Sequence, residues 1–132
     1  MTAEDDRWRI YSDLVTPARD YINAQRLRRK IQRALDEFFA DFDAVISPTL
    51  STVAGPIEQP FHEWSRGFAS TSIGGASNAA GLPAVSIPNG FDGKGLPTGL
   101  QFVSRAFDEL TLLRLASTYQ EQTDWHTRHP EV

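Results

Sequence analysis

The sequence predicts an α/β fold in which a small mixed sheet of about three strands is packed by two main helices. Two stretches with apolar residues at spacings of three and four predict the helices, because this spacing places side chains on one helical face. Short β-branched runs bounded by proline and glycine predict the strands. The 132 residues suit one compact domain, so we expect residues 1–132 to form a single domain.

The first predicted helix runs from Pro17 to Phe42, with Thr16 and Pro17 in the favoured N-cap and first-turn positions. Only Arg28 interrupts its apolar stripe, which consists of Tyr21, Ala24, Ile31, Leu35, Phe38 and Phe42. The other face is basic and carries Arg26, Arg29, Lys30 and Arg33. Such a face is usually solvated. The net charge of −4 also disfavours nucleic acid as a partner, because phosphate binding needs a basic surface.

Three strands are predicted, over residues 43–49, 84–88 and 99–104. The turn-rich segment 89–97 lies between the last two of them, which predicts a β-hairpin. The sheet is small, so we expect at least one strand edge to lack a partner and the chain not to exist as a bare monomer.

The remaining segments complete the expected order of elements. Residues 50–68 predict an irregular loop, and residues 70–80 a short helix ended by Gly81. Asp108 is the expected cap of the last helix, whose apolar residues are Leu110, Leu112, Leu113, Leu115, Ala116 and Tyr119. These cover more than one narrow stripe, so we expect neighbours on more than one side, with Leu113 and Phe38 among the buried residues. From Gln122 onward we expect a tail.

Several classes of protein and site are disfavoured. The absence of cysteine excludes disulfides and thiolate sites. The acidic start is unlike a signal peptide, and no apolar run approaches the roughly 20 residues that span a membrane. We therefore expect a cytoplasmic protein with no membrane partner and no cofactor. His126 and His129 have a spacing that suits a shared metal, but no third ligand lies nearby, and His62 stands alone. No metal site is predicted.

Three stretches, taken in order, resemble the C-terminal third of an amidase signature protein. The first is residues 21–49, an arginine-rich helix that runs into FFADFDAVISPTL. The second is NAAGLPAVSIP at residues 78–88, followed by GLPTGLQ at residues 95–101. The third begins at Phe107 and opens the leucine-rich helix that ends near Trp125. Their order and spacing make the resemblance specific.

The resemblance implies that catalysis uses a serine nucleophile, a bridging serine and a lysine base, all of which precede the matched region. We therefore expect no catalytic residue in this chain. A lysine base must be buried enough to lose its proton near neutral pH. Lys30 and Lys94 are the only lysines, and both are expected in solvent. Residues 74–78 look superficially like the nucleophile loop, but they align better with the small-residue segment before the NAAGLP motif.

The resemblance also implies that this segment lines the substrate pocket. Amidotransferase A subunits have an acidic residue seven positions before the motif's asparagine, where this chain has Thr71. A cationic amino-acid substrate is therefore less suited to the pocket. The candidate substrate-binding residues are Thr71, Ser72, Gly74 and Asn78. The alternative is that these small residues simply permit close helix packing.

Three hypotheses for the function stay open. The chain is an amidase segment that completes the fold and pocket, or an interaction subunit that docks on a separate chain carrying the catalytic serine and lysine, or an inactive relic. The expected partner is a second copy or an N-terminal amidase chain. A small amide would bind only if such a partner completed the pocket.

Overall fold

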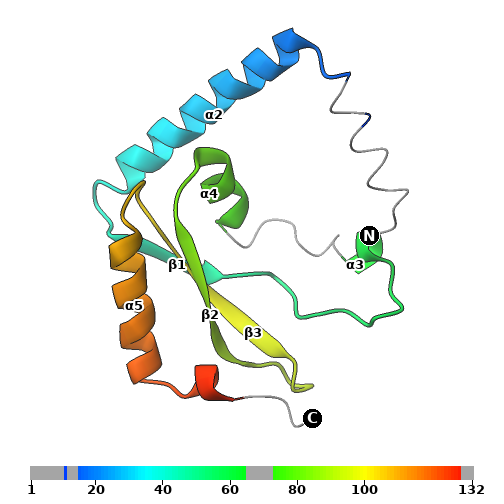
Figure 1. Ribbon diagram of the computed structural model, residues 1–132, viewed down its shortest axis with the longest axis vertical. Helices are drawn as coiled ribbons and strands as arrows, with labels where there is room; N and C mark the ends of the chain where they lie inside the picture. The colour runs from blue at the N-terminus through cyan, green and yellow to red at the C-terminus, as the bar shows by residue number, and fades with distance from the viewer. Residues whose placement is uncertain (1–10, 12–14, 65–72, 129–132) are drawn as a thin grey trace.

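The computed structural model describes residue 11 and residues 15–64 and 73–128 (Figure 1). Its elements follow the order α2 (Ala18–Phe38), β1 (Ala44–Pro48), α3 (Phe61–Trp64), α4 (Gly74–Ala80), β2 (Ala84–Phe91), β3 (Pro97–Ser104), α5 (Glu109–Glu121) and the 3₁₀-helix η2 (Trp125–Thr127). The predicted α/β fold class with three strands is confirmed. Within the described ranges, none of the helices has the length and apolar character that crossing a membrane requires.

The sheet has the strand order β1-β3-β2 and is antiparallel throughout, not mixed as predicted. The predicted β2–β3 hairpin is confirmed, and Asp92 shapes its turn. The Asp92 carboxylate accepts hydrogen bonds from the backbone N–H groups of Lys94 (2.9 Å) and Leu96 (2.8 Å). Both strands extend further into the turn than predicted. A bulge between Pro88 and Gly90 lets the pairing continue to Phe91, because the extra residue absorbs the interruption.

The core lies between the sheet and α5. It consists of Ile87, Phe102, Leu112 and Ala116, with Val85, Leu100 and Tyr119 packed around it. The predicted burial of Leu113 is wrong, because Leu113 is 60% exposed whereas Leu112 is 2% exposed. In the described part of the chain, the sheet covers only one side of α5. The other leucines of the helix are left in solvent.

The prediction that α2 buries its apolar stripe is also wrong. None of the α2 residues is buried, and Phe38 is 42% exposed. The helix ends at Phe38 rather than Phe42, and Pro17 takes the N-cap position. The buried residue is Phe39, directly after the helix, which is 2% exposed. Figure 1 shows the reason, because α2 runs away from the sheet and packs on α4.

Two segments predicted to be irregular contain short helices. The expected tail forms η2, whose Trp125 ring packs edge-on against Phe91 at 6.1 Å, so residues 125–127 cover the end of β2. The loop after β1 contains α3, where the Trp64 indole N–H donates to the Val53 carbonyl at 3.0 Å. Aromatic side chains give both segments a fixed position that their turn-rich sequence did not predict.

Candidate functional site

A groove lined by hydroxyl groups lies where β1 ends against the β2–β3 hairpin. Its volume is about 560 Å³. Its lining residues are Pro48, Thr49, Leu50, Ser51, Thr52, Val53, Ala54, Ser86, Asn89, Pro97, Thr98 and Gly99. Among these described residues, none carries a charge. The groove can therefore accept an uncharged group that makes hydrogen bonds. An ion would bind poorly, because it would lose its hydration water and find no opposite charge in the groove.

Two side-chain contacts organise the groove. The hydroxyl groups of Thr49 and Ser86 form a hydrogen bond of 2.6 Å across β3. The Thr98 hydroxyl donates to the Asn89 amide oxygen at 2.8 Å, a contact that does not use the Asn89 NH₂ group. A hydroxyl has one donor and two acceptor positions. Each of these pairs therefore retains hydrogen-bonding capacity for a bound molecule.

Gly99 makes the contact between Thr49 and Ser86 possible. It lies between the two side chains on the central strand, where a Cβ atom would stand 2.8 Å from Thr49 Oγ1 and 3.2 Å from Ser86 Oγ. The backbone of Gly99 also accepts the Thr49 N–H at 2.8 Å. The absence of a side chain on Gly99 therefore brings β1 and β2 hydroxyls together over β3.

We expect Gly99→Ala to lower the free energy of unfolding by about 1–3 kcal/mol, because the added methyl group overpacks this site. Gly93→Ala is the matched control, since a Cβ atom there meets nothing within 4 Å. Urea unfolding of both variants measures the difference. Equal midpoints for the two variants would show that the Thr49 and Ser86 side chains move aside at no cost.

The structure places Gly74 and Asn78, two of the four predicted pocket residues, apart from this groove. Gly74 and Asn78 lie on α4 and do not line the groove, and Thr71 and Ser72 lie outside the described residues. Asn78 instead borders a second groove of about 530 Å³ between α2 and α4. The sequence reasoning missed the hydroxyl-lined groove. Its signal was weak, consisting of Thr49, Ser51 and Thr52 just after β1 and of Ser86 and Asn89 in β2.

The position of Ser77 is unsuitable for a catalytic nucleophile. It is fully buried, and its hydroxyl donates to the Gly74 carbonyl within α4 at 3.0 Å. The helix ends at Gly81, as predicted, and Gly81 has the left-handed conformation (φ 80°). These contacts favour packing as the role of the Ser77 side chain, since a nucleophile must reach a substrate.

The other candidate groups are spread over the surface. Lys30 and Lys94 are both exposed, as predicted. His126 is exposed in η2, whereas His129 and the His62 side chain lie outside the described part of the structure. In that described part, no group of three histidine or carboxylate side chains is placed to hold a metal ion.

Comparison with known proteins identifies the family. The family model described as Amidase matches residues 6–113, most of the chain. The chain belongs to the amidase family. The matched range of this amidase-family chain includes α2, the whole sheet, both grooves and the start of α5.

The relatives are much longer than this chain. The A subunit of glutamyl-tRNA(Gln) amidotransferase from Chloroflexus aggregans is 44% identical over 112 residues, which cover 85% of this chain and 23% of the relative. An amidase of Pseudomonas putida is 40% identical over 126 residues, covering 91% and 27%. The crystal structure of the corresponding amidotransferase chain from Thermotoga maritima superposes with a TM-score of 0.59 at 29% identity, covering 93% and 28%. The chain thus spans about a quarter of the length of these relatives.

Proposed function

We propose that this amidase-family chain is the C-terminal portion of a hydrolase that acts on non-peptide C–N bonds. It completes the fold and the substrate pocket, while the serine–serine–lysine residues lie in another part of the amidase fold. The observation that carries this proposal is the match to about a quarter of the Pseudomonas putida amidase over 91% of this chain. The exposed lysines and the buried Ser77 support it, because neither suits a catalytic base or nucleophile.

The proposed pocket takes a small, uncharged amide and uses no cofactor. Thr71, Ser72, Gly74 and Asn78 are proposed to line it, with threonine at the position where amidotransferase A subunits have an acidic residue. The groove beside Thr49 and Ser86, which Gly74 and Asn78 do not line, offers uncharged hydroxyl groups that match a carboxamide in hydrogen bonding.

A second candidate is a non-catalytic interaction subunit. The exposed apolar side of α2 favours it, because such surfaces usually mark an interface. The partner is then a second copy or an N-terminal amidase chain, and the catalytic groups lie on that separate chain. In either case we propose a cytoplasmic location.

The test compares two forms of the chain. One is the free 132-residue chain, and the other is a chimera in which the chain replaces the matched segment of the Pseudomonas putida amidase. With an amide that the parent enzyme hydrolyses, we expect ammonia release from the chimera and none above background from the free chain. In the chimera, Ser77→Ala should leave kcat within about threefold of the unsubstituted protein, since loss of a catalytic group costs far more.

Two results would contradict the proposal. One is turnover by the free chain that Ser77→Ala abolishes while the far-ultraviolet circular dichroism stays unchanged. The other is a folded chimera without amidase activity, which would mean that this chain does not form a working pocket wall.

A further inference from the structure

We infer that the apolar side of α2, together with the groove between α2 and α4, is the surface on which the rest of the amidase fold packs. This inference rests on the proposed function and names the surface that the proposed partner uses. We call the surface the α2 stripe and define it by Tyr21, Ala24, Leu27, Ile31 and Phe38.

The α2 stripe is apolar and exposed along its whole length. Leu27 is 60% exposed, and the exposed large apolar residues also include Tyr21, Ile31 and Phe38. Helices in proteins gain most of their stability by packing an amphipathic face, not from intrinsic propensity. A helix of 21 residues without one buried side chain therefore lacks its main source of stability in this chain alone.

Hydrogen bonds to α4 hold the middle of α2, and one of them comes from Arg28, the charged residue that interrupts the stripe. The Arg28 Nε group donates to the Ala79 carbonyl at 2.7 Å, and the Gln32 amide donates to the Ala80 carbonyl at 2.8 Å. These carbonyls belong to the last turn of α4, where no helical partner remains for them. With Arg28 engaged in this way, the groove beside it stays largely apolar, being lined by Ala24, Gln25, Leu27, Arg28, Ile31, Asn78 and Ala79.

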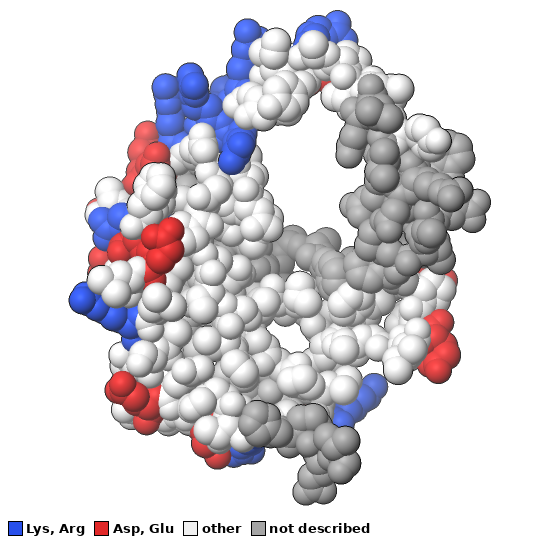
Figure 2. Space-filling view, in the orientation of Figure 1, with Lys and Arg blue, Asp and Glu red and all other residues white. Residues whose placement is uncertain are grey.

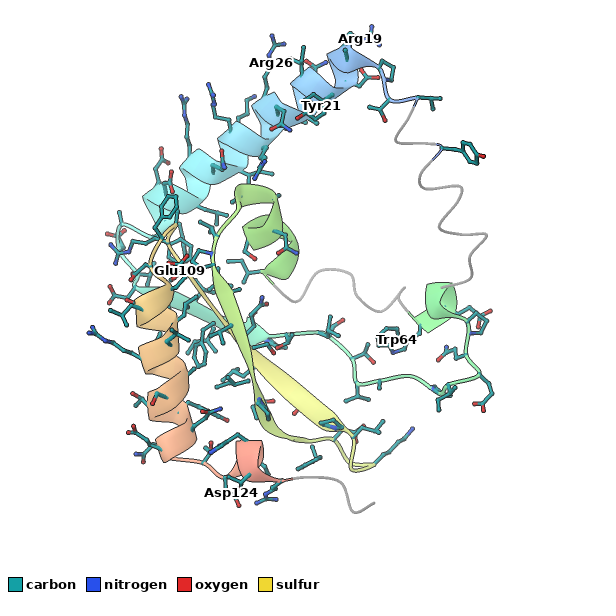
Figure 3. All side chains as sticks on the ribbon, viewed as in Figure 1. Arg19, Tyr21, Arg26, Trp64, Glu109 and Asp124 are labelled. Carbon is teal, nitrogen blue, oxygen red and sulfur yellow. The ribbon has the colours of Figure 1, made fainter. Side chains whose placement is uncertain are left out.

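The two sides of α2 have opposite characters. Figure 2 shows lysine and arginine side chains along the outer side of α2, where Arg26, Arg29, Lys30 and Arg33 lie. In Figure 3, Arg26 projects from that outer side, whereas Tyr21 lies on the inner side. A basic side belongs in solvent, and an apolar side belongs against a partner. The partner therefore approaches from the inner side.

The apolar surface continues from α2 to the open edge of the sheet. The Phe38 and Phe42 rings stack at 4.9 Å, just before β1 begins. Within the described residues, β1 pairs only with β3, and Ile46 on this edge strand is exposed. The Thr49 N–H donates to the Gly99 carbonyl, and in an antiparallel pair only every second residue hydrogen-bonds to the partner strand. The N–H and C=O groups of Ile46 therefore face away from β3.

The length of the relatives identifies what covers this surface. The family match includes all of α2, and the matched segment is 23% of the Chloroflexus aggregans relative, which leaves 77% of that chain outside it. The same helix pattern thus belongs, in the relatives, to a chain with three times more residues available to bury it. A second copy of this chain is the competing occupant.

The test introduces one charge on either side of α2. Leu27→Asp lies on the α2 stripe, and Ile22→Asp, the matched control, lies on the other side, where the wild-type residue is 50% exposed. Both variants are made in the free chain and in the Pseudomonas putida chimera described above.

In the free chain we expect both variants to leave Tm nearly unchanged, because exposed substitutions have small effects. In the chimera we expect Leu27→Asp to lower Tm by about 5 °C or more, and Ile22→Asp to lower it little. Leu27→Ala gives the same order of effects should the aspartate variant not fold.

Three other results would overturn the inference. Equal shifts for Leu27→Asp and Ile22→Asp in the chimera would show that the α2 stripe stays in solvent. Failure of the unsubstituted chimera to fold, beside parent amidase that does fold, would show that this surface does not fit the rest of the fold. A free-chain dimer that Leu27→Asp dissociates, with a chimera indifferent to Leu27→Asp, would assign the surface to a second copy. By contrast, a folded, inactive chimera that keeps the expected Tm pattern contradicts the proposed function and supports the inference.

Discussion

Replacement of Leu112 by alanine is expected to lower the free energy of unfolding by about 2–5 kcal/mol, the range for large-to-small changes in a packed core. Leu112 lies on the side of α5 that faces the sheet, in the cluster with Ile87 and Phe102. Removing its isopropyl group leaves a cavity beside Phe102, and the two strands that carry the cluster are held by the hairpin. The structure therefore has little freedom to collapse into the cavity.

The neighbouring residue provides the control. Leu113→Ala is expected to change the free energy of unfolding by less than about 0.5 kcal/mol, because the side chain is already in solvent. Urea unfolding followed by circular dichroism measures both variants in the free chain. A Leu113→Ala loss as large as that of Leu112→Ala would mean that the outer side of α5 is covered in solution, for example by a second copy.

The strands could be predicted because their signals are local. β-Branched runs such as Val45–Ile46, and the turn residues between β2 and β3, lie within a few positions of each other, so no distant contact is needed to interpret them. The strand ends were less predictable. Pro88 indicates the end of a strand, yet the bulge that follows it lets the pairing continue to Phe91, and a bulge depends on the partner strand.

Helix burial could not be predicted in the same way, because it depends on which neighbours are present. The pattern from Tyr21 to Phe42 correctly indicates an amphipathic helix, but a pattern does not say whether these 132 residues include the surface that covers it. On α5, the number of leucines predicted that neighbouring elements would cover several sides of the helix. In the described residues, the sheet covers only one side of it. Both errors have the same cause. We infer that the sequence carries the burial pattern of a larger fold than the chain itself forms.

The hydroxyl-lined groove was missed for a different reason. Thr49, Ser86 and Gly99 are far apart along the chain, and only the registers of β1 and β2 against β3 bring them together. Each is ordinary by itself, and none carries a charge that would mark it as a site. Short-range patterns therefore found the motif around Asn78 but had no means of finding a groove built from three strands.

Phe39→Ala is expected to lower the free energy of unfolding of the free chain by about 3–5 kcal/mol, the range for buried phenylalanine. Phe39 is buried at the point where α2 ends, and its N–H group donates to the Leu35 carbonyl at 2.9 Å. Its backbone leaves the helical conformation (φ −76°, ψ 1°). The helical spacing that predicts burial of Phe38 and Phe42 therefore no longer applies after the helix ends, and the Phe39 side chain is the one that turns inward.

Phe38→Ala tests whether the stability contribution of this segment differs between the free chain and the Pseudomonas putida chimera. In the free chain we expect a loss below about 1 kcal/mol, since Phe38 is partly exposed and its ring packs on the neighbouring Phe39 and Phe42 rings. In the Pseudomonas putida chimera the loss should approach that of Phe39→Ala, because the α2 stripe is then covered. Chemical unfolding of the four proteins, two variants in each setting, gives this comparison directly. A Phe38→Ala loss that is large in the free chain would show that α2 already packs its apolar side without the rest of an amidase. The exposure of the stripe would then not be a property of this chain in solution.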